Sequence, residues 1–357
     1  MAHHQPNDYA LVIGVNDYPN HGSKGKNLKG AVPDAKRFAA WLTNTQVGGG
    51  LPPANCHLIT STTAPLSPVK DTVDSALEKI WDAAEEAGGG RRFYLFFAGH
   101  GQSITIGDVS DTDVALCLPQ WSRRRLFDTL SSDNYCRTVK RCMPFQQVVA
   151  FLDCCRSRTV RAATQNSGLG CLTPSDIAED VKGVIVYAAE DESQAFETAT
   201  GRGDEDEEQS EARGYFTTAL LSALNGAAAR DTGGAEWESL WDHLQAEVPR
   251  LAQKAGKTQS PRIKDFGLPN DAVFGAAMPV AGGAGASPNF TVHFSADRTG
   301  PVILLNDRAE PVRSGDPASG PWHVRLSYAL HTLVDTGTGG VLPIMFAPEM
   351  EGGDVTF

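Results

Sequence analysis

The stretch VVAFLDCCRS, residues 148–157, is an apolar run that ends abruptly in an acid, two thiols and an arginine. A continuous apolar run bounded by polar residues is typical of a buried parallel strand. A second stretch, RFYLFFAGHGQ at residues 92–102, has the same build and ends with His100 between two glycines. Chemistry in open α/β sheets lies just beyond the carboxyl ends of the strands. The two stretches therefore offer a thiol and an imidazole, which nucleophilic cysteine catalysis requires.

The composition is that of an ordinary globular protein, with 357 residues, 41% hydrophobic and 21% charged. The formal net charge of -12 argues against a nucleic-acid-binding surface and fits a partner or substrate with basic residues. No apolar run approaches the roughly 20 residues that span a bilayer, and the N-terminus lacks the apolar core of a signal peptide. We therefore expect a cytoplasmic protein without nucleic-acid or membrane partners.

The cysteines are seven in number and irregular in spacing, and no C-x-x-C pair occurs, so a zinc knuckle or a thioredoxin-type site is not expected. Without a secretion signal we expect all of them to be reduced thiols, most of them small core side chains. They are Cys56, Cys117, Cys136, Cys142, Cys154, Cys155 and Cys171.

Strand-like and helix-like segments alternate along most of the chain. This alternation predicts an α/β fold, with a mostly parallel sheet that carries helices on both faces. Residues 113–119 are predicted to extend it as an antiparallel strand outside the main sheet. The predicted strands are 9–15, 56–59, 92–100, 148–153 and 183–189, and the predicted helices are 32–42, 69–87, 134–147, 216–224 and 237–251.

Three regions follow from composition. Residues 1–275 are predicted to form the α/β domain, and residues 276–288 (AAMPVAGGAGASP) have the Gly, Ala and Pro content of a linker. Residues 289–357 contain short alternating runs separated by Gly, Pro and Asp turns, which predicts a small β-sandwich-like domain. This accessory domain could dock a partner or serve only as a structural cap, and the sequence leaves both readings open.

The chemistry predicted at the two strand ends is that of a cysteine nucleophile. A thiol with an ordinary pKa of about 8.5 is mostly protonated at neutral pH, and a nearby imidazole can take its proton. Side chains alternate along a strand, so Asp153 and Cys155 share one face and Cys154 points toward the core. Cys155 is therefore the candidate nucleophile and His100 its partner, while the glycines beside His100 leave backbone N–H groups open to an oxyanion.

The segment DCCRS aligns with the caspase signature Q-A-C-[RQG]-G, with Cys155 on the nucleophile and His100 at 55 residues before it. FAGHGQ is similar to the segment around the caspase histidine, and YALVIGVNDY, LKGAVPDAKRF and GYFTTALLSAL add further matches. The chain resembles bacterial caspase-like cysteine peptidases of the metacaspase and paracaspase group, clan CD, over about residues 8–275. The resemblance implies a caspase-like sheet, protein substrates and an oxyanion site at the N–H groups of Gly101 and Cys155.

Where caspases have Gln two residues before the nucleophile, this chain has Asp153, as metacaspases do. In that group this Asp and one that corresponds to Asp34 form an acidic primary specificity pocket. Two carboxylates in one pocket are best neutralised by a cation, preferably a guanidinium bound at two points. The resemblance and the electrostatics both imply cleavage after Arg or Lys.

Activation by proteolytic processing, or by another upstream signal, is a further expectation. The acidic loop at residues 201–213 holds Arg202 and Arg213, and the loop after the nucleophile holds Arg158 and Arg161. A protease with an acidic pocket could cut these loops itself, or an upstream protease could do so. The open alternative is that the acidic run is a solvated loop that keeps basic substrates near the cleft.

Several groups are predicted to carry no chemistry. Asp108, Asp111 and Asp113 do not reproduce the acidic cluster of calcium-dependent metacaspases, so no metal or other cofactor is expected. Asp191 and Glu192 match an acidic position of metacaspases and could lie at the rim of the pocket, but a solvated loop is the favoured reading. The remaining histidines show no ligand spacing and are set aside; they are His3, His4, His21, His57, His243, His293, His323 and His331.

Two rival functions remain open on the sequence. One is a catalytically silent, caspase-homologous scaffold in which the β-rich tail binds a partner, although the presence of both His100 and Cys155 speaks against it. The other is a separase-like or gingipain-like peptidase of the same clan.

Overall fold

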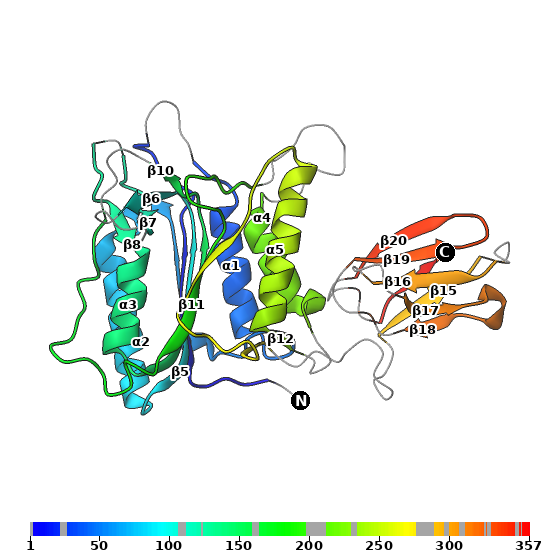
Figure 1. Cartoon of the computed structure of the whole chain (residues 1–357), viewed down its shortest axis with the longest axis horizontal. Helices are drawn as coiled ribbons and strands as arrows, with labels where there is room; N and C mark the ends of the chain where they lie inside the picture. The colour runs from blue at the N-terminus through cyan, green and yellow to red at the C-terminus, as the bar shows by residue number, and fades with distance from the viewer. Residues whose placement is uncertain are drawn as a thin grey trace. The chain divides into compact units, whose positions relative to one another are not determined.

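The computed structural model describes residues 3–21, 27–105, 112–122, 124–158, 164–197, 212–229, 234–275, 289–295, 300–306, 311–324, 326, 330–346, 350 and 352–357. The chain divides into two compact units (Figure 1). The first comprises Met1–Leu221 and Leu244–Ala272, and the second comprises Ser222–His243 and Val273–Phe357. The three-region division predicted from composition stays a prediction, since the linker at 276–288 lies outside the described residues.

The first unit is built on a six-stranded sheet in the order β13-β11-β9-β5-β1-β2. Every neighbouring pair is parallel except β11 and β13, so the predicted mostly parallel sheet is confirmed. The strands are β1 (Asp8–Gly14), β2 (Cys56–Thr60), β5 (Gly90–Ala98), β9 (Phe145–Asp153), β11 (Lys182–Tyr187) and β13 (Arg262–Asp265), and a short hairpin joins β3 (Thr62–Thr63) to β4 (Leu66–Ser67).

Helices cover both faces of this sheet, which explains why its central strands are apolar throughout (Figure 1). Phe97 of β5 belongs to one buried cluster with residues of α2 and α3, whereas Phe96 stacks at 4.6 Å on Phe38 of α1 on the other face. The helices are α1 (Ala31–Thr43), α2 (Lys70–Glu86), α3 (Ser132–Cys142), α4 (Tyr215–Ser222) and α5 (Trp237–Lys254), with short turns at Pro53–Asn55, Ala223–Ala227 and Pro317–Ser319.

The boundary between α3 and β9 differs from the prediction, which continued the helix to residue 147. Helix α3 ends at Cys142, and β9 begins at Phe145. Pro144 has no N–H to continue a helix, and the ring of Phe145 packs 5.6 Å from that of Tyr9 in the core. The strand that carries the cysteines therefore starts three residues earlier than its apolar run indicates.

A four-stranded sheet in the order β10-β6-β7-β8 lies beside the carboxyl ends of the main strands (Figure 1). Its strands are β6 (Gly101–Thr105), β7 (Thr112–Cys117), β8 (Thr129–Ser131) and β10 (Ser157–Arg158). Strand β7 pairs antiparallel with β6, which confirms the predicted extension. Because β6 begins at Gly101, only Gly99 and His100 separate it from β5, and the histidine is fixed between two strands.

One pair of cysteines contradicts the expectation that every thiol is reduced. Cys142, the last residue of α3, forms a disulfide with Cys171, and their Cα atoms are 5.4 Å apart. The segment after β10 lies against the end of α3, where the N–H of Ser175 donates to the carbonyl of Arg141 at 2.7 Å. The remaining cysteines, Cys56, Cys117, Cys136, Cys154 and Cys155, are free thiols.

The described residues between 289 and 357 form two small sheets, which confirms the predicted β-rich segment. The rings of Phe290 and Phe346 meet at 5.2 Å, and the guanidinium of Arg313 lies 5.1 Å from the ring of Trp322 in the other sheet. The strands are β15 (Phe290–His293), β16 (Val302–Leu305), β17 (Pro311–Gly315), β18 (Trp322–Val324), β19 (Leu330–Asp335), β20 (Val341–Met345) and β21 (Asp354–Thr356), and β12 (Ala235–Glu236) pairs with β14 (Val273–Phe274). Within the described ranges, no helix is long and apolar enough to cross a membrane.

Candidate active site

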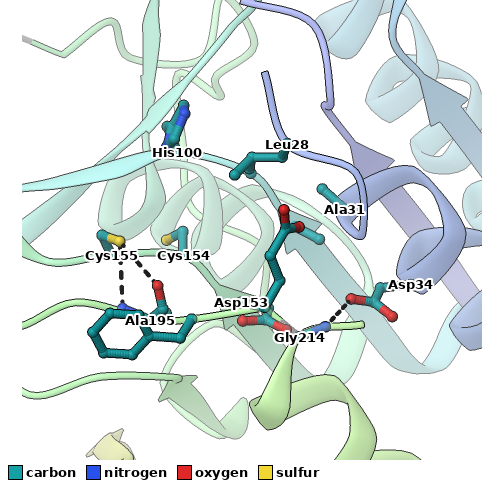
Figure 2. A pocket seen from close by; sticks show the side chains of 13 residues that line it. Leu28, Ala31, Asp34, His100, Asp153, Cys154, Cys155, Ala195 and Gly214 are labelled. Atoms are coloured by element: carbon teal, nitrogen blue, oxygen red, sulfur yellow. Dashed lines mark hydrogen bonds between the residues drawn. The ribbon is translucent and has the colours of Figure 1, made fainter. Parts of the chain in front are cut away.

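The register of the two central strands brings His100 and Cys155 to one edge of the sheet. Ala98 of β5 pairs with Asp153 of β9, and the N–H of Gly99 donates to the carbonyl of Asp153 at 3.2 Å. His100 and Cys155 each lie two residues beyond this pair. Both side chains line the same pocket, together with Asp34 (Figure 2).

The sulfur of Cys155 contacts the backbone of one residue across the pocket. The N–H of Ala195 donates to Sγ at 3.3 Å, and the thiol donates back to the Ala195 carbonyl at 3.4 Å (Figure 2). Cys154 is only 2% exposed, and burial raises the pKa of its thiol well above the ordinary value. Of the two adjacent thiols, Cys155 is the more accessible.

His100 is held through its backbone and its ring. Its N–H donates to the hydroxyl of Tyr18 at 2.8 Å, and this hydroxyl donates to the carbonyl of Cys117 at 3.1 Å. The ring of Tyr18 lies 4.5 Å from the His100 ring, and the ring of His21 lies 4.8 Å from it. The sequence analysis set His21 aside, and this contact shows that it lies beside the candidate site.

The two predicted pocket acids meet at a single glycine. Asp34 lies in the first turn of α1 and accepts the N–H of Gly214 at 2.7 Å, while Arg37 donates to its other oxygen at 2.9 Å. Asp153 ends β9 and accepts the N–H and the hydroxyl of Thr217 at 3.1 and 2.6 Å. Both carboxyl groups are almost fully buried. The structure thus brings together two acids that are far apart in the sequence.

The electrostatics of this pair are unusual. Burial, and after it the negative charge of Asp153, raise the pKa of Asp34 to about 7. Burial likewise raises the pKa of Asp153 to about 6, with a smaller contribution from Glu197. The two carboxyl groups are removed from water, and Arg37 supplies a positive charge to only one of them. A second cation between them would therefore be stabilised.

Glu197 is a third acid of the pocket, and the sequence analysis missed it. Its carboxylate accepts the N–H of Gly30 at 2.8 Å and that of Lys29 at 3.2 Å, just before α1. The sequence analysis considered Asp191 and Glu192 instead. Asp191 accepts the hydroxyl of Ser103 and is absent from the residues that line the pocket. The only sequence signal for Glu197 is its place ten residues after the end of β11.

Gly101, expected to help bind an oxyanion, lies against the backbone of the cysteine pair. A Cβ atom at Gly101 would lie 2.6 Å from the carbonyl oxygen of Cys155, so only glycine allows this approach. The lining of the pocket includes Gly99 and His100 but not Gly101. The role of its N–H therefore stays a prediction.

The arginines predicted as processing sites are only partly described. Arg213 is exposed and directly precedes Gly214. Arg158 is placed by its backbone as the second residue of β10. Arg161 and Arg202 lie outside the described residues.

Asp113, one of the three acids weighed for calcium, is buried in a hydrogen-bonded network. Its carboxylate accepts the hydroxyls of Ser131 at 2.5 Å and Ser132 at 3.0 Å and the N–H of Asp133 at 3.0 Å. Asp108 and Asp111 lie outside the described residues. Across the ranges that the structure covers, no three His, Cys, Asp or Glu side chains form a group that could hold a metal ion.

The mostly parallel six-stranded sheet, with a histidine and a cysteine beyond the ends of its adjacent central strands, defines a caspase-like fold. The model of the caspase domain of peptidase family C14 matches residues 7–272. The chain belongs to this family.

Individual relatives are more distant. A probable protease from a Desulfuromonadales bacterium is 26% identical over 283 residues, which cover 72% of this chain and 31% of that protein. The match thus spans about a third of the relative's length. Among solved structures, protein GSU0716 from Geobacter sulfurreducens shares 18% identity with a TM-score of 0.46, covering 77% of this chain and 98% of its own. Pro-sf-caspase-1 shares 11% identity with a TM-score of 0.41, covering 73% and 88%.

Proposed function

We propose that the protein is a cysteine endopeptidase that cleaves proteins after Arg and, less well, after Lys. Membership of the caspase family supports a protease. The observation that carries the finer proposal is the convergence of Asp34 and Asp153 on Gly214 in the pocket that Cys155 and His100 also line. A pocket that buries two carboxylates beside a thiol fits a substrate with a cationic side chain directly before the scissile bond.

In the proposed reaction, the Cys155 sulfur attacks the scissile carbonyl carbon, and His100 takes up the thiol proton. The N–H groups of Cys155 and Gly101 donate to the oxyanion of the tetrahedral intermediate. His100 then gives its proton to the leaving amine as the C–N bond breaks, which leaves an acyl-enzyme thioester. Water, deprotonated by His100, attacks the thioester, and the thiol departs with that proton.

Selection for arginine follows from the arrangement of the acids. A guanidinium presents a planar fork of donors that can reach two carboxylates at once, whereas the lysine ammonium is a compact point charge. Arg37 donates to one oxygen of Asp34. A substrate guanidinium would therefore bind at the other oxygen, which is on the side of Gly214 and Asp153. The proposal therefore ranks P1 Arg above Lys and far above Asp.

Activation is part of the proposal. The Cys155 thiol is hydrogen-bonded to Ala195 in this structure, and attack on a substrate requires that the sulfur leave this contact. Cleavage after Arg158, Arg161, Arg202 or Arg213, by the enzyme itself or by an upstream protease, would free loops on either side of the site. Another upstream signal could release the same contact.

Fluorogenic peptides with Arg, Lys or Asp at P1 test the proposal. The intact protein and a form nicked by an Arg-specific protease, which is then inhibited, are compared with Cys155→Ala and Asp153→Asn. Cys154→Ala is the matched control, because Cys154 is the adjacent, buried thiol. Cleavage after Arg that both variants lose and the control keeps would support the proposal. An intact and nicked protein that cleave no peptide, or that prefer P1 Asp, would overturn it.

A further inference from the structure

Four aromatic side chains, that of His100 among them, form a cluster beyond the ends of three separate strands. Tyr18 and His21 follow β1, His100 follows β5, and Trp121 follows β7. His21 contacts both neighbours, with its ring 4.8 Å from the His100 ring and 4.7 Å from the Trp121 ring. Trp121 is buried, so His21 packs against a fixed surface.

The backbone of His100 is fixed, but this alone does not orient its ring. The Tyr18 hydroxyl accepts the His100 N–H, and the Cys117 N–H donates to the His100 carbonyl at 2.9 Å. Rotation about the side-chain bonds of His100 is limited instead by the rings packed on it, those of Tyr18 and His21. Tyr18 is fully buried and tied to Cys117, which makes it an immobile wall.

We infer that His21 is a positioning residue, which holds the His100 ring in the orientation that proton transfer with Cys155 requires, with Trp121 as its support. The inference rests on the proposed function, in which His100 carries the proton. Proton transfer depends steeply on geometry, because small displacements of a catalytic group cost up to about 100-fold in rate. The ring of His21 acts by packing on the His100 ring, at an interplanar angle of 36°, and has no contact with substrate in this role.

The test compares His21→Ala, which removes the ring, with His21→Phe, which keeps a planar ring between His100 and Trp121. With P1 Arg peptides, we expect His21→Ala to lower kcat by about 10-fold or more with little change in KM, because binding of the P1 side chain is untouched. His21→Phe is expected to restore most of kcat. His57→Ala, at a half-buried histidine of β2, is the matched control and leaves kcat unchanged.

A measurement that needs no proteolysis separates this inference from the proposed function. The His100 imidazole resonance is assigned by its loss in His100→Ala. In the intact protein its position reports the ring currents of the neighbouring Tyr18 and His21 rings. We expect this resonance to move toward the position of a free imidazole in His21→Ala and to stay shifted in His21→Phe. An unmoved resonance in His21→Ala would overturn the inference even if peptides are cleaved. A moved resonance in a protein that cleaves nothing would sustain the positioning contact and overturn only the proposed function.

Discussion

The carboxyl groups of Asp34 and Asp153 reach the same glycine from two different elements of the fold. Asp34 accepts the Gly214 N–H at 2.7 Å, and a Cβ atom on Gly214 would lie 2.2 Å from an oxygen of Asp153. Asp34 lies in helix α1, and Asp153 is the last residue of β9, two positions before the candidate nucleophile Cys155. The acidic pocket therefore forms only when α1 and β9 pack together in the fold. A substitution at Gly214 tests it, because a side chain there would contact both acids.

Gly214→Ala is expected to damage the pocket directly. The new methyl group would overlap Asp153 and lie 3.1 Å from Asp34, so the carboxylates must move. Overpacking of this kind costs about 1–3 kcal/mol. We therefore expect kcat/KM for P1 Arg peptides to fall by about 10-fold or more, together with a lower Tm.

Gly170→Ala is the matched control for that substitution, because nothing lies within 4 Å of a Cβ atom at Gly170. It is expected to leave both the kinetics and the Tm unchanged. Full P1 Arg activity in Gly214→Ala would contradict the assignment of the pocket.

The raised pKa values of the two acids predict opposite trends of stability and activity with pH. Unfolded carboxyl groups titrate near about 4, whereas the pKa of Asp153 is about 6 and that of Asp34 about 7 in the fold. The folded state thus holds these protons more tightly, and the stability this contributes is full below about pH 4 and is lost as the pH rises through 6 to 7. Cleavage after Arg should rise over the same interval, because ionised carboxylates bind the guanidinium.

Thermal unfolding of the wild type and Asp34→Asn from pH 5 to pH 8 checks the first trend. We expect the difference in the free energy of unfolding between the two proteins to change by on the order of 1–3 kcal/mol over this interval, in favour of Asp34→Asn at high pH. Parallel pH profiles for the two proteins would show that Asp34 does not titrate there.

Local sequence patterns were sufficient for the sheet and for the residues at its strand ends. The apolar runs before His100 and Cys155 predict that both side chains lie at strand ends, and the register shows that these two strands are neighbours. The end of α3 was predicted too late, because Phe145 is equally compatible with a helix and with a strand until its packing on Tyr9 is known.

Contacts between loops could not be predicted from the same patterns. Glu197 and His21 lie in irregular segments with no periodicity, and each contacts a residue distant in the chain, Gly30 and His100 respectively. The disulfide is of the same kind, since a separation of 29 positions between its cysteines carries no spacing signal. The direction of a side chain in a helix or strand follows from its position in the repeat, whereas the direction of a side chain in a loop does not.

Calcium removal is expected to leave the activity unchanged. Asp113, the described member of the acids weighed for calcium, already accepts hydrogen bonds from Ser131 and Ser132 and is almost fully buried. Dialysis against a calcium chelator should therefore alter kcat/KM for P1 Arg peptides by less than about twofold, within the variation of a surface effect. Activity that is lost on dialysis and restored by added Ca²⁺ would contradict this prediction.

The Cys142–Cys171 disulfide predicts which processing loop can be cut without separating the fragments. A cut after Arg158 or Arg161 leaves one cysteine of the disulfide on each fragment. The two pieces therefore stay joined on a non-reducing gel and separate after reduction. A cut after Arg202 or Arg213 releases a fragment that holds no cysteine, since Cys171 is the last in the chain, and it separates without reductant.

Limited digestion with an Arg-specific protease, with N-terminal sequencing of each band, makes the comparison. Cys171→Ser is the control, in which every cut separates the fragments with or without reductant. Two bands from unreduced wild-type protein cut after Arg158 would show that the disulfide does not join these segments. A disulfide that survives such a cut would keep the His100 and Cys155 segments attached to the chain that supplies Ala195, Glu197 and Gly214, because Cys142 lies on the first fragment and Cys171 on the second.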